Sequence, residues 1–133
     1  MTYKVLDASA LIAYLEKETG YEVLEDLFSK AVEAEKKLLM STVNWGEVYY
    51  ILARDHGLKN GEGVIGIIQT FPIDLVPADI NLARQAALYK YSKKLPYADC
   101  FAAALTKLHK GELITCDKEF RLVDEDIKIL WLN

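Results

Sequence analysis

The chain has 133 residues, enough for one domain with a sizeable core, and 52% of them are hydrophobic, which excludes a disordered chain. No apolar run approaches the roughly 18 residues of a membrane span. Nothing resembles a signal peptide, since Met1 leads straight into a predicted strand. We therefore expect one cytoplasmic domain over residues 1–133, without membrane contact. The net charge of −4 argues against nucleic-acid binding but does not exclude it, because the surface outside an acidic site can still carry a basic patch.

The opening stretch predicts a strand that runs into a helix. Residues 3–6 are a short apolar run of β-forming residues, and Asp7 follows it at once. Apolar residues then recur at helical spacing, at Leu11, Ile12 and Leu15. Asp7 thus stands at the turn between the two elements. Taken alone it is best interpreted as a helix N-cap, for which Asp is a preferred residue.

The rest of the chain alternates predicted helices and strands. The helices cover residues 21–36, 43–55, 59–71, 79–94 and 98–110. The strands cover residues 38–40, 73–76, 113–116 and 128–132, with a short turn at 118–120 before the last strand. Ser41 or Thr42 can cap the helix at 43–55. Strands separated by helices imply a parallel sheet covered on both faces, so we expect a compact three-layer α/β/α domain.

Four carboxylates stand where such a sheet would bring them to one edge. Asp7 and Asp117 each follow a predicted strand directly. Glu47 comes early in the helix after the second strand, in line with Asn44 one turn before, and Asp99 opens the helix before the fourth strand. In an open parallel sheet, ligands bind beyond the carboxyl ends of the strands. Each acid alone is better explained as a cap, a helix-dipole acid or a solvated residue, but all four together favour a site.

The chemistry of this acidic set points to divalent cations. Four anions in one crevice repel and raise one another's pKa values, and a folded protein tolerates them best by binding cations there. Hard oxygen ligands favour Mg²⁺ or Mn²⁺ over Zn²⁺. One or two such ions can polarise a phosphate and activate water for in-line displacement.

The acids lie in four blocks of sequence that together resemble a PIN domain and, in length and layout, the VapC-type toxins of toxin–antitoxin pairs. The blocks are VLDASALIAYL, STVNWGEVYYIL, LPYADCFAAALT and LITCDKEF, and they span nearly the whole chain in the family's order. The family's acidic residues fall on Asp7, Glu47, Asp99 and Asp117, and its hydroxyl positions fall on Ser9 and Thr115. The resemblance implies a five-stranded parallel sheet in the order 3-2-1-4-5 and a Mg²⁺- or Mn²⁺-dependent ribonuclease. Some relatives carry a further acid at the position of Glu119, whose role stays open.

For the substrate, we expect single-stranded or looped RNA, because an unstacked backbone can enter a narrow acidic crevice. The candidate phosphate contacts flank Asp99 and Asp117 in sequence, and they are Lys93, Lys94, Lys118 and Arg121. Each of these four residues, taken singly, is better explained as an ordinary solvated side chain.

Tyrosines on two predicted helices suggest an interface. Tyr49 and Tyr50 on one helix, and Tyr89 and Tyr91 on the other, cannot all face the core. Those that face outward either lie singly on the surface or form an interface, where aromatic residues are enriched. The family resemblance favours a homodimer. It also implies an antitoxin whose basic side chain, an Arg, enters the acidic crevice and competes with the cation.

Other classes of protein fit less well. A metal-independent ribonuclease would need an acid–base pair, usually His, but His56 and His109 stand at helix ends, where the helix dipole explains them. An aspartyl phosphatase usually has a second Asp where this chain has Ser9, and a phospho-receiver domain needs an acidic pair beside the first strand. The remaining alternative is a PIN-like adaptor without metal or nuclease activity. It is disfavoured because all four acids are present.

The cysteines point to no redox or zinc chemistry. The chain has two, Cys100 and Cys116, and they form no C-x-x-C motif. Neither a zinc site nor a disulfide framework is therefore indicated. We expect both thiols to behave as small buried hydrophobic side chains.

Overall fold

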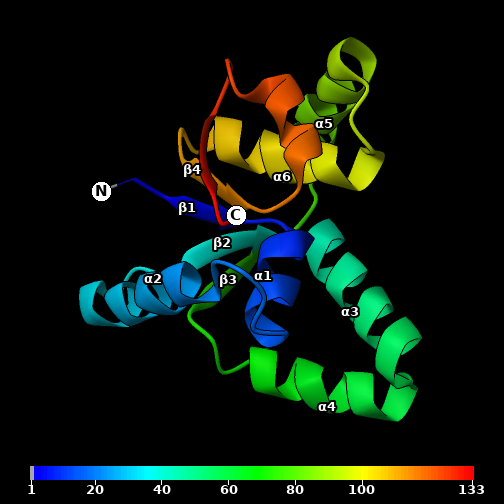
Figure 1. The fold of residues 1–133 in the computed structure, drawn as a ribbon. Helices are drawn as coiled ribbons and strands as arrows, with labels where there is room; N and C mark the ends of the chain where they lie inside the picture. The colour runs from blue at the N-terminus through cyan, green and yellow to red at the C-terminus, as the bar shows by residue number, and fades with distance from the viewer. Residues whose placement is uncertain (1) are drawn as a thin grey trace.

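The computed structural model describes residues 2–133, so Met1, the first residue of the predicted domain, lies outside the described residues. Strands and helices alternate along the chain (Figure 1). The strands are β1 (Lys4–Leu6), β2 (Leu38–Ser41), β3 (Ile73–Val76), β4 (Glu112–Thr115) and β5 (Lys128–Trp131). The helices are α1 (Ala8–Leu15), α2 (Tyr21–Ala34), α3 (Thr42–His56), α4 (Leu58–Ile68), α5 (Ile80–Lys93), α6 (Tyr97–Leu108) and the short 3-10 helix η1 (Lys118–Val123).

The strands form one parallel sheet in the order β3-β2-β1-β4-β5, which confirms the predicted topology. The strand order reverses between β1 and β4, which pair in the centre of the sheet with Leu6 opposite Ile114. Both strands end at the same edge, so the residues that follow them are neighbours. This edge is the place where open parallel sheets bind ligands.

Each face of the sheet has its own hydrophobic core. Alternate strand residues point to opposite faces, so Val5 packs with α5, α6 and η1, whereas the next residue, Leu6, packs with α1 to α4. Leu113 and Ile114 on β4 divide in the same way. Figure 1 shows the resulting three layers, with α5 and α6 on one side of the sheet and α1 to α4 on the other. No helix within residues 2–133 has the length and apolar character needed to cross a bilayer.

The structure corrects the predicted ends of some elements. Helix α4 ends at Ile68 rather than at residue 71, because the N–H groups of Thr70 and Phe71 bond to carbonyls three residues back and tighten the chain into a turn before Pro72. Helix α2 ends two residues early, since Glu35 adopts a left-handed conformation with φ 52°.

Two expectations close to β4 are also corrected. The predicted turn at 118–120 is a longer element, η1, which continues to Val123 because Phe120 and Val123 are both buried in the core beneath α6. Cys100 is buried as expected, but Cys116 is only half-buried, because it follows β4 at the edge of the sheet. Both thiols are free.

Candidate active site

Asp7 lies between β1 and α1 and is 2% exposed. It is the N-cap of α1, and its Oδ1 accepts a hydrogen bond of 2.9 Å from the N–H of Ala10. The capping interpretation of Asp7 is therefore correct. The Asp7 carboxylate has further contacts beside this cap, because each of its oxygens can accept more than one hydrogen bond.

Two hydroxyl groups hold the same carboxylate. Ser9 Oγ lies 2.9 and 2.8 Å from the two oxygens of Asp7, and Thr115 Oγ1 donates to Oδ2 at 2.6 Å. Thr115 is the last residue of β4, so the acid that follows β1 is fixed by the neighbouring strand. Thr115 Oγ1 also accepts the N–H of Asp117 at 3.0 Å. One buried hydroxyl thus links Asp7 to the backbone of a second acid.

Asp117 is the N-cap of η1, and its Oδ1 accepts the N–H of Glu119 at 3.0 Å. Its negative charge acts on Asp7 and raises the pKa of that carboxyl. Burial is the larger cause and raises the Asp7 pKa to about 6, although the hydrogen bonds from Thr115, Ala10 and Ser9 lower it. Glu119 itself is exposed, and only its backbone takes part in this contact.

Glu47 lies on α3, and a hydrogen bond from Asn44 holds its side chain. The cap of this helix is Ser41, whose Oγ accepts the N–H of Asn44 at 3.2 Å. Asn44 is fully buried, and its Nδ2 donates to Glu47 Oε1 at 3.1 Å and to the carbonyl of Ala98 at 3.0 Å. Ala98 immediately precedes Asp99 in α6. The backbone acceptor at Ala98 could not be anticipated from sequence, since any residue type supplies a carbonyl.

Asp99 is the acid on which the other three act together. It lies in the first turn of α6 and is 9% exposed. Burial raises its pKa to about 8, together with the negative charges of Asp117, Asp7 and Glu47 and a hydrogen bond with Asp117. No cation of residues 2–133 is among the causes of this shift. The site is therefore a set of acids without a compensating positive charge from the described chain.

The donor set fits a hard divalent cation. Carboxylate oxygens from four side chains are the ligand type that Mg²⁺ and Mn²⁺ prefer. Within residues 2–133, however, no three Asp, Glu, His or Cys side chains are already gathered closely enough to hold an ion. The other acids are close enough to Asp7 and Asp99 to raise the pKa values of those two carboxyls, and a cation would have to draw the set closer together.

The four basic residues singled out from sequence lie on both sides of the acids along the chain. Lys93 ends α5 and is half-buried, and Lys94 follows it as an exposed residue in the left-handed conformation. These two lead into α6 and Asp99. Lys118 and Arg121 are exposed on η1, beyond Asp117.

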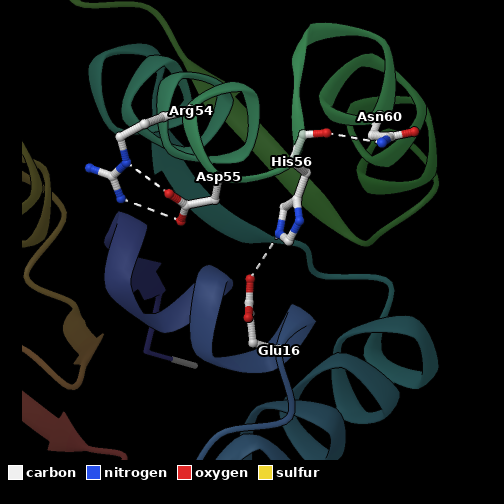
Figure 2. Close-up of polar contacts among 5 residues, drawn as sticks. All are labelled: Glu16, Arg54, Asp55, His56 and Asn60. Carbon is white, nitrogen blue, oxygen red and sulfur yellow. Dashed lines mark hydrogen bonds and ion pairs between the residues drawn. The ribbon is translucent and has the colours of Figure 1, made fainter.

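The two histidines lie at the C-terminal ends of α3 and α6. His56 ends α3, and its Nε2 lies 3.2 Å from Glu16 Oε1 at the end of α1 (Figure 2). In the same view the carbonyl of His56 accepts a hydrogen bond from Asn60 in α4, and Arg54 pairs with Asp55. His109 is the C-cap of α6 and packs edge-on against Tyr3, with ring centroids 5.1 Å apart. Both histidines thus stand at helix ends, as predicted, and their contacts are with Glu16 and Tyr3.

The sequence did not indicate that Cys116 contacts a residue of the acidic site. Cys116 donates its backbone N–H to Ser9 Oγ at 3.2 Å, and its Sγ lies 3.4 Å from the carbonyl of Ser9. It therefore helps to hold Ser9 against Asp7. Its position between Thr115 and Asp117 was the available signal.

Comparison with known proteins identifies the family of the chain. Residues 4–126 match the model of the PIN domain family, and the chain therefore belongs to that family. Ribonuclease VapC30 of Mycobacterium tuberculosis and Ribonuclease VapC of Mycolicibacterium smegmatis are each 32% identical to it over 127 residues, which cover 90% of this chain and 94% and 95% of theirs. The fold is similar to that of the DNA-bound VapBC of Salmonella typhimurium, with a TM-score of 0.75 and 13% identity over 100% of both chains. The resemblance to PIN domains of the VapC type is confirmed.

Proposed function

We propose that the protein is a metal-dependent endoribonuclease, acting in the cytoplasm as the toxin of a VapBC-type toxin–antitoxin pair. Relatives named as ribonucleases, 32% identical over nearly their whole length, support this function. The observation that carries it is Asp99, whose pKa of about 8 reflects burial beside three other acids. Such a set becomes fully ionised near neutral pH only if a cation compensates its charge.

In this proposal Mg²⁺ or Mn²⁺ is held by Asp7, Asp99 and Asp117, with Glu47 acting directly or through water. The bound ion supplies Lewis acidity and an activated water for hydrolysis of an RNA phosphodiester. Asp7 presents its carboxylate in a fixed orientation, because Ser9 and Thr115 hold both of its oxygens. Asp99, with its pKa raised to about 8, carries a proton near neutral pH and releases it when the cation binds.

The proposed substrate is single-stranded or looped RNA. Its phosphates would contact Lys93 and Lys94 on the Asp99 side of the site, and Lys118 and Arg121 on the Asp117 side. Lys94, Lys118 and Arg121 are exposed and Lys93 is half-buried, so they can reach a backbone without a change of fold. Unstacked strands suit the proposal because their backbone can enter a narrow acidic crevice.

We also propose two protein partners. The first is a cognate antitoxin, whose Arg would pair with the clustered carboxylates and compete with the cation for them. The second is another copy of the chain. Tyr89 is buried at 4%, whereas Tyr91 on the same helix is 87% exposed and lies with Ile80 and Leu88 along the outer side of α5. An exposed apolar stripe of this kind supports a homodimer.

Sedimentation and inhibition assays test these partners. A dimer should sediment at micromolar concentration, and a monomer there would contradict this part of the proposal. Inhibition by the antitoxin should weaken as Mg²⁺ rises. An antitoxin that inhibits equally well after its Arg is changed to Ala would contradict the proposed pairing of that Arg with the carboxylates.

Cleavage of single-stranded RNA by the purified protein tests the enzyme itself. EDTA should stop cleavage, and added Mg²⁺ or Mn²⁺ should restore it. Asp7→Asn should lower the rate by about a thousandfold or more, because a bound cation contributes several kcal/mol to such a reaction. Asp79→Asn is the matched control, since Asp79 caps α5 through the N–H of Leu82 in the same way that Asp7 caps α1.

Two results would contradict the proposal. Cleavage that EDTA leaves unchanged would exclude the metal, and full activity of Asp7→Asn would exclude the acidic site. A folded protein that neither binds Mn²⁺ nor cleaves RNA would favour the metal-free adaptor instead.

A further inference from the structure

The two helices that bring Glu47 and Asp99 to the site are joined by one buried amide. Asn44 lies one turn before Glu47 on α3 and is 0% exposed. Its Oδ1 accepts the hydroxyl of Ser41 at 2.7 Å, and its Nδ2 donates to Glu47 and to the carbonyl of Ala98. The orientation of the amide follows from its neighbours, because a carbonyl and a carboxylate can only accept and must therefore face the nitrogen.

The start of α6 has no side-chain cap of its own, which is also true of α2 and α4. Its N-cap is Pro96, which makes no side-chain hydrogen bond to the helix. By contrast, Asp7, Ser41 and Asp79 each cap their helices through a side-chain oxygen. The first turn of α6 does receive a hydrogen bond from another helix, because Asn44 donates to the carbonyl of Ala98. Because Asp99 follows Ala98 directly, this bond also positions the backbone of Asp99.

Only an amide can make all of these contacts. Asn offers one acceptor and two donors, and here each of them has a partner. Asp in its place would keep the acceptor for Ser41 but lose both donors and add a buried charge beside Glu47. Ala would remove the link between the helices altogether and leave the buried Ser41 hydroxyl without its acceptor.

We propose that Asn44 is a positioning residue for cation binding, which sets Glu47 and Asp99 relative to each other so that both face the same ion. This inference rests on the proposed function of the acidic site. Asn44 acts through the acids and not on substrate, because a side chain with no exposed surface contacts neither RNA nor bulk water. Hydrogen-bonded partners of metal ligands usually matter in this way, and their loss lowers metal affinity by about 10–100-fold.

Calorimetric titration of Mn²⁺ into the full chain without RNA tests this role. Asn44→Ala should bind Mn²⁺ about 10–100-fold more weakly than the unmodified chain, and the Mn²⁺ concentration that gives half-maximal cleavage should rise by a similar factor. Asn44→Asp should weaken binding as well, although it nearly preserves the size and shape of the side chain. Val48→Ala is the control for general destabilisation, because Val48 is fully buried on the same helix. It should unfold at a lower temperature yet keep its Mn²⁺ affinity.

A second measurement needs no substitution. In the unmodified chain, the side-chain N–H signals of Asn44 in an NMR spectrum should move as Mg²⁺ binds, since one of them bonds to Glu47. Those of Asn60, which bonds to the carbonyl of His56 at 2.9 Å (Figure 2), should stay in place.

The outcomes separate this inference from the proposed function. Normal Mn²⁺ affinity in both Asn44 variants, or Asn44 signals that ignore Mg²⁺, would overturn the positioning role and leave the proposed function standing. Should the variants fail to fold, the NMR titration still decides the point. An unmodified chain that binds no Mn²⁺ and cleaves no RNA would instead overturn the proposed function, and the positioning role with it.

Discussion

The acidic site has two halves that are built differently. In the strand half, Asp7 and Asp117 follow the neighbouring parallel strands β1 and β4, and the hydroxyl of Thr115 links them. In the helix half, Glu47 lies in the second turn of α3 and Asp99 in the first turn of α6, and the amide of Asn44 links Glu47 to the carbonyl that precedes Asp99. The register of the sheet sets the distance across the strand half. The helix half has no such backbone ladder and depends on side chains.

This difference appears in the pKa values of the buried acids. Asp7 is almost fully buried, yet its pKa rises only to about 6, because three hydrogen-bond donors oppose the effect of burial. The pKa of Asp99 rises to about 8, since its only hydrogen bond among the causes is with another acid and raises the value further. Donors from the end of β4 and the start of α1 thus make one acid easier to ionise. The acid on the helix has no such donor among the causes of its pKa shift.

The largest expected effect concerns Asp99 and the pH dependence of stability. Its pKa is about 8 in the folded chain and 3.8 in an unfolded reference, so the folded state binds the proton more tightly. The stabilisation is fully present below about pH 4 and is lost as the pH rises through about 8. Without metal, the free energy of unfolding should therefore fall across this range, by on the order of a few kcal/mol. Urea unfolding in EDTA at several pH values measures it.

Asp99→Asn removes the titrating group and should flatten the upper part of this curve. The variant should be more stable than the unmodified chain at about pH 8. Added Mn²⁺ should stabilise the unmodified chain there and have little effect on the variant, because a ligand stabilises only the state that binds it. Asp79→Asn, which changes a cap outside the acidic site, should keep the full slope. If the free energy of unfolding of Asp99→Asn falls as steeply with pH as that of the unmodified chain, Asp99 does not have a pKa higher than that of Asp7.

Thr115→Val tests the strand half with a smaller effect. The substitution keeps the shape of the side chain but removes the donor to Asp7 and the acceptor for the N–H of Asp117. It should cost about 1–3 kcal/mol of stability, because buried polar groups lose their partner. The hydrogen bond from Thr115 is the largest influence that lowers the Asp7 pKa, so that pKa should rise above about 6. NMR titration of the carboxyl carbons measures this change.

Thr106→Val is the matched control for this substitution. Thr106 is equally buried, but its hydroxyl bonds to the carbonyl of Ala102 within α6 and not to an acid. The Asp7 pKa should stay the same in that variant. If Thr115→Val also leaves the Asp7 pKa at about 6, the hydroxyl is not what keeps this acid easier to ionise than Asp99.

The smallest expected effect concerns RNA affinity on the two sides of the site. In an Asp7→Asn background that prevents cleavage, Lys93→Ala with Lys94→Ala should weaken RNA binding and reduce its dependence on salt. The slope of log affinity against log salt should fall by roughly 0.7 for each phosphate that the variant no longer neutralises. Lys118→Ala with Arg121→Ala should do the same on the side of the strand half.

Lys30 and Lys37, which pair with Asp26 and Asp74 away from the acids, provide a control pair. An unchanged slope shows that the pair in question does not bind phosphate.

Much of the fold could be predicted from sequence because its determinants are local. Alternating helix and strand patterns predicted every strand and every α-helix, although not η1, and the resemblance of the four acidic blocks supplied the strand order that the structure confirms. Capping was also readable, since Asp7 stands between a strand and a helix and does cap α1. The end of α4 was misplaced because apolar spacing continues to Phe71, while a local turn stops the helix three residues earlier.

Contacts between distant elements were decided only by the tertiary structure. The tyrosine pattern showed that some rings must face outward, but packing decided that Tyr89 is buried and that Tyr50 and Tyr91 are exposed. The sequence placed Asn44 one turn before Glu47, yet its bond to Ala98 spans 54 residues and ends on a backbone carbonyl. A residue's own chemistry and its near neighbours determine helices, strands and caps. Which groups meet across the sheet edge depends on how those elements pack, and no short stretch of sequence records that packing.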